Sequence, residues 1–340
     1  TTFNPIPNFA AESGPAEGVE YYDTVNGASS GGLGLTFPPL PSVVGLDGGA
    51  AVVVGGGDAS DHDAAVYSDQ AWIIPAGQPT SDQVINLSLS SARYGATLMA
   101  AGGGALVWGG AVEDLDAARG VWIDEAGVVV ELAGAEDEAQ TMFAAGLHVG
   151  TTGDSARFIV LGGTEIGSDG SHELAVTAEH ALLLTVDLVQ STVGASSLDF
   201  GAEAVQLQRA GGSLTSLSDG TFWFLGGYQS FGASAAGPCG AGGGVCLPPQ
   251  TLRFELTEAG AVDLSPPQLG SLPAQDGWDV GPLGASLVRQ SDGSWLVVSG
   301  FGDVAVTGSS QAPTDEATLV RFEVAGADLC TTAVEEEDTL

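Results

Sequence analysis

Short apolar runs recur along the chain, each preceded by a tight polar turn and followed by a pair of small residues. Runs of four or five apolar residues bounded by Gly, Asp and Ser are typical of buried strands between turns. Five copies align on the small pair: DGGAAVVVGGGD (47–58), GGGALVWGGA (102–111), DSARFIVLGGT (154–164), SDGTFWFLGGY (218–228) and DGSWLVVSGFGD (292–303). The fifth copy has Ser299 and Gly300 where the others have two glycines. The pattern predicts one type of strand, repeated five times.

Each copy belongs to a longer unit with four predicted strands. The glycine pairs lie about 50–65 residues apart, a period in the range of propeller blades. A strand of small residues precedes the turn, as in YGATLM (94–99), and suits the crowded innermost position of a blade. After the glycines come a loop, a third strand such as LRFEL (252–256) and an outer strand such as VVVELAG (128–134). No helical period appears, so we expect an all-β fold, a single β-propeller of four-stranded blades.

The number of blades follows from counting strands. The last unit has no evident outer strand after Val324, whereas GLTFPPL (34–40) resembles the outer segment VDLSPPQL (262–269). We therefore expect an N-terminal strand to supply the missing strand and close the ring, because closure leaves no exposed sheet edge. Five blades are predicted, with six as the alternative. The expected domains are an N-terminal arm (1–32), the propeller (33–326) and an acidic C-terminal tail (327–340).

A DG turn, four apolar residues and GG together resemble the kelch repeat. GASLVRQSDGSWLVVSG (284–300) and GATLMAAGGGALVWGG (95–110) resemble its bacterial form, and the likeness extends over 43–324. The chain lacks the regular Tyr after the glycines and the regular Trp after the third strand of the animal repeat. The resemblance implies a kelch-type β-propeller but no particular function, since propellers include both enzymes and binding modules.

The charge is strongly acidic. Asp and Glu number 43 against 7 basic residues, all arginine, for a formal net charge of −36. Such a chain is repelled by nucleic acid and anionic membranes, which argues against both as partners. A solubilising surface suited to a salty medium is the first interpretation, and a surface for one cationic partner is the second.

Cysteines and the chain start bear on localisation. Cys239 and Cys246 bracket GAGGGV, and a disulfide between them would indicate an oxidising compartment, although two free thiols fit equally. Cys330 is left over, free or paired with another chain. The chain begins TTFNPIPNFAAES without an apolar leader, which we interpret as a processed, mature form. We expect an extracellular or cell-surface bacterial protein, with the periplasm as the alternative.

Long, dissimilar segments follow the glycine pairs, whereas the turns before them are short. In a four-stranded blade these long loops emerge on one face, where binding residues concentrate on rigid scaffolds. We expect a ligand-binding face for a protein or glycan, and neutral loop variation is the alternative. Its candidate residues are two aromatics and two polar residues: Tyr228, Phe231, Asp169 and His172.

Carboxylates in the first of these loops suggest a metal. Asp58, Asp61 and Asp63 lie close together with His62 and Asp69, and several oxygens are what Ca²⁺ prefers. The central Gly of an EF-hand loop is absent, and chance clustering among so many acids is the alternative. A transition metal at His62 and His172 is a weaker hypothesis.

No catalytic residue is assigned. His148 is expected to be a hydrogen-bonded residue of an inner strand and His180 to lie at the exposed end of a strand, without a Ser or Cys partner. Arg253 and Arg321 recur two residues before a Glu, which predicts structural ion pairs.

The sequence thus favours a secreted or cell-surface binding propeller without catalysis. A carbohydrate-active enzyme with loop carboxylates at the central channel is one alternative. A structural subunit of a surface assembly is the other.

Overall fold

The computed structural model describes residues 16–23, 28–38, 41–58, 66–77, 79–112, 117–165, 179–217, 219–228, 251–257, 260–266, 286–289, 295–298, 319–325 and 328–332. Regular structure in these residues is β-strand apart from two short 3-10 helices, η1 (Ser81–Gln83) and η2 (Gly201–Leu207). The all-β prediction is therefore confirmed. The chain divides into two compact units, one of Thr1–Ile159, Ile166–Glu173 and Leu183–Ser196, the other of Val160–Glu165, Leu174–Leu182 and Ser197–Leu340.

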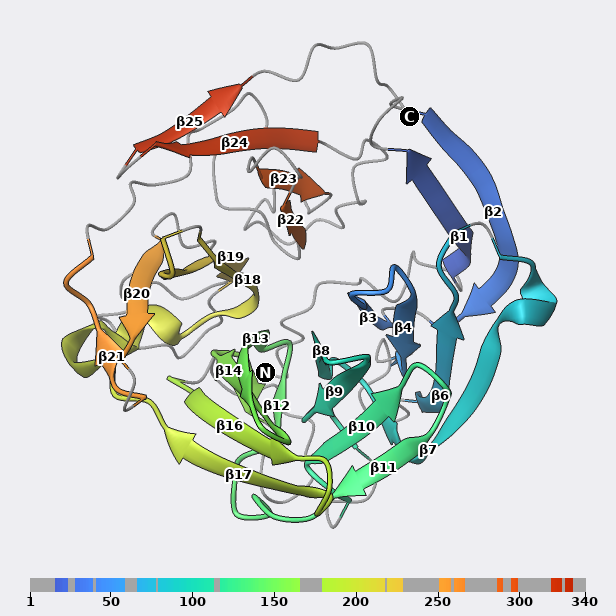
Figure 1. Cartoon of the computed structure of the whole chain (residues 1–340), viewed down its shortest axis with the longest axis horizontal. Helices are drawn as coiled ribbons and strands as arrows, with labels where there is room; N and C mark the ends of the chain where they lie inside the picture. Colours follow the sequence, from blue (N-terminus) through green and yellow to red (C-terminus); the bar gives the residue numbers. More distant parts are fainter. Residues whose placement is uncertain are drawn as a thin grey trace, which may run out of the picture. The chain divides into compact units, whose positions relative to one another are not determined.

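The first unit contains two sheets in which each strand pairs antiparallel with the next along the chain (Figure 1). The first sheet has the order β3 (Ser42–Gly45), β4 (Ala51–Val54), β6 (Val66–Ile74), β7 (Ile85–Arg93), with the short β5 (Gly57–Asp58) beside the start of β6. The second has the order β8 (Thr97–Ala101), β9 (Gly104–Trp108), β10 (Gly120–Asp124), β11 (Val129–Leu132). These are the predicted four-stranded units.

Three further sheets follow the same order. One comprises β13 (Ala145–Thr152), β14 (Ser155–Leu161), β16 (Ala181–Asp187) and β17 (Thr192–Ser197), and the short strands β12 (Thr141–Met142) and β15 (Thr164–Glu165) pair with each other. The next comprises β18 (Ala210–Ser216), β19 (Phe222–Tyr228), β20 (Leu252–Leu256) and β21 (Val262–Asp263). The last comprises β22 (Ser286–Arg289), β23 (Trp295–Val298), β24 (Leu319–Ala325) and β25 (Asp328–Thr332).

The last sheet corrects one expectation. Its outer strand is β25, which follows β24 directly and lies in the segment expected to be a tail, so no N-terminal strand is needed to complete this sheet. The N-terminal strands β1 (Ala16–Asp23) and β2 (Ala28–Phe37) pair with each other instead. A short connection keeps β24 and β25 adjacent at little entropic cost, which favours the local partner over a distant one. The number of blades and the closure of a ring stay predictions.

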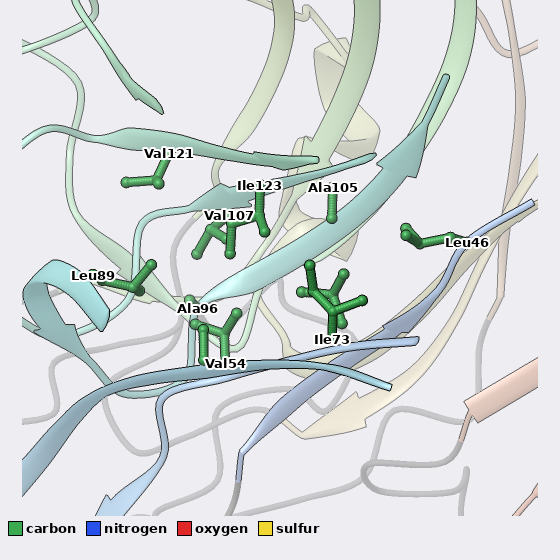
Figure 2. Packing of buried hydrophobic residues seen from close by; sticks show 11 residues of the cluster. Leu46, Val54, Ile73, Leu89, Ala96, Ala105, Val107, Val121 and Ile123 are labelled. Carbon is green, nitrogen blue, oxygen red and sulfur yellow. The ribbon is translucent and has the colours of Figure 1, made fainter. Parts of the chain in front are cut away.

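Apolar side chains from the two sheets of the first unit form one core cluster (Figure 2). Val54 and Ile73 come from the first sheet, and Val107 and Val121 come from the second. All five residues of β9 are buried, which explains why its sequence is an unbroken apolar run and not an alternating one. On the other side of the first sheet, Phe37 packs edge-on against Trp72 with ring centroids 5.0 Å apart.

Hydroxyl groups on the innermost strands tie successive sheets together. Ser42 Oγ donates to the carbonyl of Ala96 at 2.6 Å, and Thr97 Oγ1 donates to the carbonyl of Ala144 at 2.9 Å. Both hydroxyls lie at the start of an inner strand, and each acceptor lies just before the inner strand of the next sheet. The small polar residues of the predicted inner strands thus have a structural use as well as a small volume.

Candidate functional site

The glycine pairs lie at the point where each second strand gives way to its long loop. Both members of four pairs have positive φ: 63° and 92° at 55–56, 63° and 87° at 109–110, 67° and 98° at 162–163, and 67° and 81° at 226–227. Two consecutive left-handed residues are accessible to glycine at low cost and to other residues only with strain. The chain therefore turns sharply here in four sheets in the same way.

The amide of the first glycine is bound to the third strand of its own sheet. Gly55 N donates to Gln70 O at 2.8 Å, Gly109 N to Arg119 O at 2.9 Å and Gly162 N to His180 O at 2.7 Å. Arg119 and His180 directly precede their third strands, β10 and β16, and Gln70 lies within β6. Both ends of the long segment are thereby held together by one hydrogen bond.

The amide of the second glycine is bound to the residue that leads into the next inner strand. Gly56 N donates to Arg93 O at 3.0 Å, Gly110 N to Thr141 O at 2.8 Å and Gly163 N to Arg209 O at 2.8 Å. We call the glycine pairs and these bonded residues the glycine frame. A Cβ atom would lie 2.1 Å from Arg93 O at Gly55 and 2.3 Å from Arg209 O at Gly162, so the frame has no room for a side chain at these positions.

Two buried arginines belong to the glycine frame. Arg93 donates from Nη1 to Gly109 O at 2.6 Å and from Nη2 to Ala118 O at 2.5 Å. Arg209 donates from Nε to Gln206 O at 2.7 Å and from Nη1 to Gly226 O at 3.4 Å. Desolvation lowers the pKa of each guanidinium to about 10, so both remain charged at neutral pH. They hold backbone carbonyls and are too buried to contact a ligand bound by the long loops.

A third arginine organises the loop before β12. Arg119 donates from Nε to Glu138 O at 3.0 Å and from Nη2 to Glu136 O at 3.2 Å. With its carboxamide oriented to suit both neighbours, Gln140 donates to Gly110 O at 2.8 Å and accepts from Arg119 Nη1 at 2.5 Å. Because Arg119 binds these backbone carbonyls, its charge fixes the path of an acidic loop.

A row of aromatic rings crosses the loop-side ends of three successive sheets. Tyr67 and Tyr94 stack with centroids 5.6 Å apart, and Phe143 meets Tyr94 edge-on at 5.3 Å. Phe143 has φ of 55°, and its amide donates to Gly95 O at 2.7 Å. The two tyrosines are buried and Phe143 is partly exposed. Sequence reasoning missed this row, although aromatic residues where strands meet long loops were a visible signal.

The residues predicted to bind a ligand are only partly within the described chain. Tyr228 ends β19 and Asp58 ends β5, so the backbone of both lies at the loop-side end of a strand. The side chains of both, and the other predicted positions, lie outside the described residues: Phe231, Asp169, His172, Asp61, Asp63, His62, Cys239 and Cys246. The ligand face, the calcium site and the disulfide stay predictions.

Among the residues that the structure describes, no three His, Cys, Asp or Glu side chains form a group that could hold a metal ion. Asp69, expected in the first loop, lies in β6 and accepts from Gln70 Nε2 at 2.8 Å and from Ser88 Oγ at 3.0 Å. The hydrogen bond from Gln70 is the main reason why the pKa of Asp69 is lowered. Within the same part of the chain, no helix is long and apolar enough to cross a membrane.

The predictions for His148 and His180 have different outcomes. His148 Nε2 lies 3.0 Å from Thr151 Oγ1, which confirms a hydrogen-bonded residue on an inner strand. The exposed position expected for His180 is wrong. The residue is partly buried, its Nε2 is buried without a hydrogen-bond partner, and burial lowers the pKa of the ring.

The structural ion pair expected of Arg253 is confirmed. Its Nη2 pairs with Asp219, and its Nε donates to Thr221 Oγ1 at 3.0 Å. Asp219 lies in the tight turn before β19, a partner that the sequence pattern did not single out. The side chain of Arg321 lies outside the described residues.

Comparison with known proteins supports the fold alone. No family profile matches the chain, and no curated protein matches it. The solved structure of YjhT, a kelch-type propeller protein, is similar with a TM-score of 0.56 and 14% identity, over 88% of this chain and 85% of that one. The chain therefore has the strand arrangement of a β-propeller, while its kelch repeat rests on the sequence resemblance.

Proposed function

We propose that this protein is a non-catalytic binding module, secreted or on the cell surface, whose long loops after the glycine pairs form the binding face. The observation that carries the proposal is the glycine frame. It gives the loops after Gly56, Gly110 and Gly163 the same rigid base, while the long loops differ in length and sequence. Variable loops on a repeated rigid base are the usual arrangement of a recognition surface.

The chemistry at the loop bases supports binding without catalysis. Arg93, Arg119 and Arg209 contact backbone carbonyls, and the hydroxyls of Ser42 and Thr97 tie sheets together. These groups are thus occupied in structure. The partly exposed ring of Phe143 adds an aromatic contact to the predicted contacts of Tyr228 and Phe231.

The partner in this proposal is a protein or a glycan, and the acidic chain disfavours nucleic acid. A glycan microarray and a displayed peptide library are suitable probes, with release of reducing sugar measured for each bound glycan. We expect saturable binding to a small set of related probes and no sugar release. Sugar release would instead support the carbohydrate-active alternative.

A pair of variants assigns any binding to the loop face. Replacing 230–249 by a short Gly-Ser linker removes most of the longest loop, and Gly103→Asn alters only a tight turn. Binding should be lost or weakened at least tenfold in the first variant and retained in the second. Equal binding by both variants would contradict the assignment to this loop.

Calcium is a proposed ligand of the loop that carries Asp58, Asp61 and Asp63. Thermal unfolding in calcium and in chelator at fixed ionic strength tests it, because a ligand of the folded state raises the midpoint. A rise with calcium that disappears in a triple Asp→Asn variant would support the site. Equal midpoints would leave these carboxylates as solvated surface.

A further inference from the structure

Arg93 is a buried cation with incomplete hydrogen bonding. Its relative exposure is 1%, and the contacts of its guanidinium are the carbonyls of Gly109 and Ala118. Its Nε–H is buried and has no partner. A buried charge is normally paired or fully hydrogen-bonded, because desolvation without compensation is costly.

Arg209 occupies the equivalent position in the glycine frame, and none of its buried nitrogen atoms lacks a hydrogen-bond partner. Its Nε donates to Gln206 O, its Nη2 reaches Gln206 Oε1 at 3.4 Å, and its guanidinium lies 5.0 Å from the centre of the Phe224 ring. The aromatic face and the extra acceptor compensate the charge at Arg209. Arg93 has an unused donor at the equivalent atom.

The charges around Arg93 do not neutralise it at close range. Apart from desolvation, the pKa of Arg93 is raised by the negative charge of Glu131 and lowered by the positive charge of Arg119. Glu131 is exposed, so water screens its charge, whereas Arg119 adds a second cation near the same glycine pair.

Two other residues whose backbones are linked to the same pair also carry buried polar atoms without partners. They are Nε1 of Trp108, which precedes Gly109, and Oγ1 of Thr141, whose carbonyl accepts from Gly110. Three of the five partnerless buried side-chain atoms in the described part of the chain thus belong to residues bonded to Gly109 or Gly110. Two of these atoms are N–H donors and the third is a hydroxyl that can donate, so the partner missing at Arg93 Nε is an acceptor.

We propose that Arg93 binds a small inorganic anion beside Gly109–Gly110, with its Nε–H as a donor. A monatomic halide fits best, because Arg93 is too buried to meet a carboxylate or phosphate of a larger molecule. The ion neutralises the buried cation and stabilises the fold beneath the loops of the first two sheets. This role is independent of what the loop face binds.

Chloride and bromide are the probes. Thermal unfolding of the full chain in sodium chloride and in sodium sulfate, at equal ionic strength, separates specific binding from screening. General salt effects favour sulfate, since it is excluded from protein surfaces. We expect chloride to raise the unfolding midpoint in a saturable way. The rise should exceed by about 2–4 °C the rise that chloride causes in a variant without the site.

Arg93→Lys removes Nε and keeps a positive charge, so it should lose the chloride-specific rise. Arg209→Lys is the matched control, because its Nε is already bonded to Gln206 O, and it should keep the rise. A rise that survives in Arg93→Lys, or that is absent from the unaltered chain, overturns the proposal.

A second measurement does not depend on variants. Crystals of the unaltered protein grown in sodium bromide should show an anomalous peak next to Arg93 Nε and none beside Arg209 Nε. Bromide peaks confined to the protein surface, or a water at full occupancy beside Arg93 Nε, would overturn the proposal.

Discussion

The two ends of each second strand need glycine for different reasons. At the tight-turn end, Gly102, Gly103 and Gly220 have positive φ, and a Cβ atom there would meet nothing within 4 Å. At the frame end, Gly55 and Gly162 have positive φ and also face a carbonyl oxygen at little more than 2 Å. Turn glycines are needed for their backbone angles alone, whereas frame glycines are needed for angles and space.

The largest effect should come from placing a methyl group in the frame. Gly162→Ala forces a Cβ against Arg209 O and strains a left-handed residue, which should cost about 3–5 kcal/mol of unfolding free energy. Gly103→Ala adds only the backbone strain, about 1 kcal/mol. Chemical denaturation of both variants checks this, and equal losses would contradict the distinction between the two kinds of glycine.

The second-largest loss of stability should come from removing Arg209, the buried arginine that donates to carbonyls of the frame. Arg209→Met removes the donors to Gly226 O and Gln206 O while keeping an apolar stem, and should cost about 2–3 kcal/mol. Arg157→Met is a suitable control, because Arg157 is a partly buried residue of β14 outside the frame. If both substitutions cost the same, Arg209 has no special role in the frame.

The tight-turn end should show a smaller effect that depends on acid. Partial burial acts to raise the pKa of Asp219, but hydrogen bonds from Thr221 and the charge of Arg253 outweigh it and hold the pKa below its usual range. The stabilisation is therefore present above the unfolded-state pKa of about 3.9 and is lost as pH falls through the folded-state value. Asp219→Asn should cost about 1 kcal/mol at neutral pH.

Unfolding of the unaltered chain and of Asp219→Asn, measured between neutral pH and strong acid, checks this expectation. The difference between the two should be constant near neutrality and should shrink below about pH 4. A difference that does not change with pH would mean that the charge of Asp219 contributes nothing.

The smallest effect belongs to His180 at the frame end. Burial lowers its pKa, so the folded state favours the neutral ring, and stability should fall as pH drops below the unfolded-state value of about 6.5. His180→Gln keeps a neutral polar side chain and should lose less stability than the unaltered chain between about pH 7.5 and 5. Parallel curves for the two proteins would contradict this.

The strand order of the sheets, apart from the outer strand of the last one, was readable from the sequence because it depends on local signals. An apolar run between turn residues, repeated at a constant period, specifies strands that pair with their neighbours along the chain. The glycine pairs were recognisable as a motif for the same reason. The outer strand β25 was missed because DLCTT carries a weak apolar signal and is assigned by its pairing with β24.

The candidate site could be predicted only in outline. The sequence placed the long loops after the glycine pairs, but it did not reveal that Gly56 binds Arg93 or that Gly163 binds Arg209. It also did not bring Tyr67, Tyr94 and Phe143 into one row, since Tyr67 lies in β6, Tyr94 between β7 and β8, and Phe143 between β12 and β13. Contacts between residues far apart in sequence follow from how sheets pack, which no local pattern encodes.

The sequence alone therefore determined the repeated strands, their turns and their order within the sheets, apart from the outer strand of the last sheet, because these follow from periodicity and backbone preference. The tertiary structure decided why the glycines come in pairs, which arginines are buried and which carboxylate pairs with Arg253. The physical reason is that space, burial and partners at a residue are set by neighbours from other strands and sheets. At Gly55 and Gly162, for example, a carbonyl oxygen from another part of the chain leaves no space for a Cβ atom.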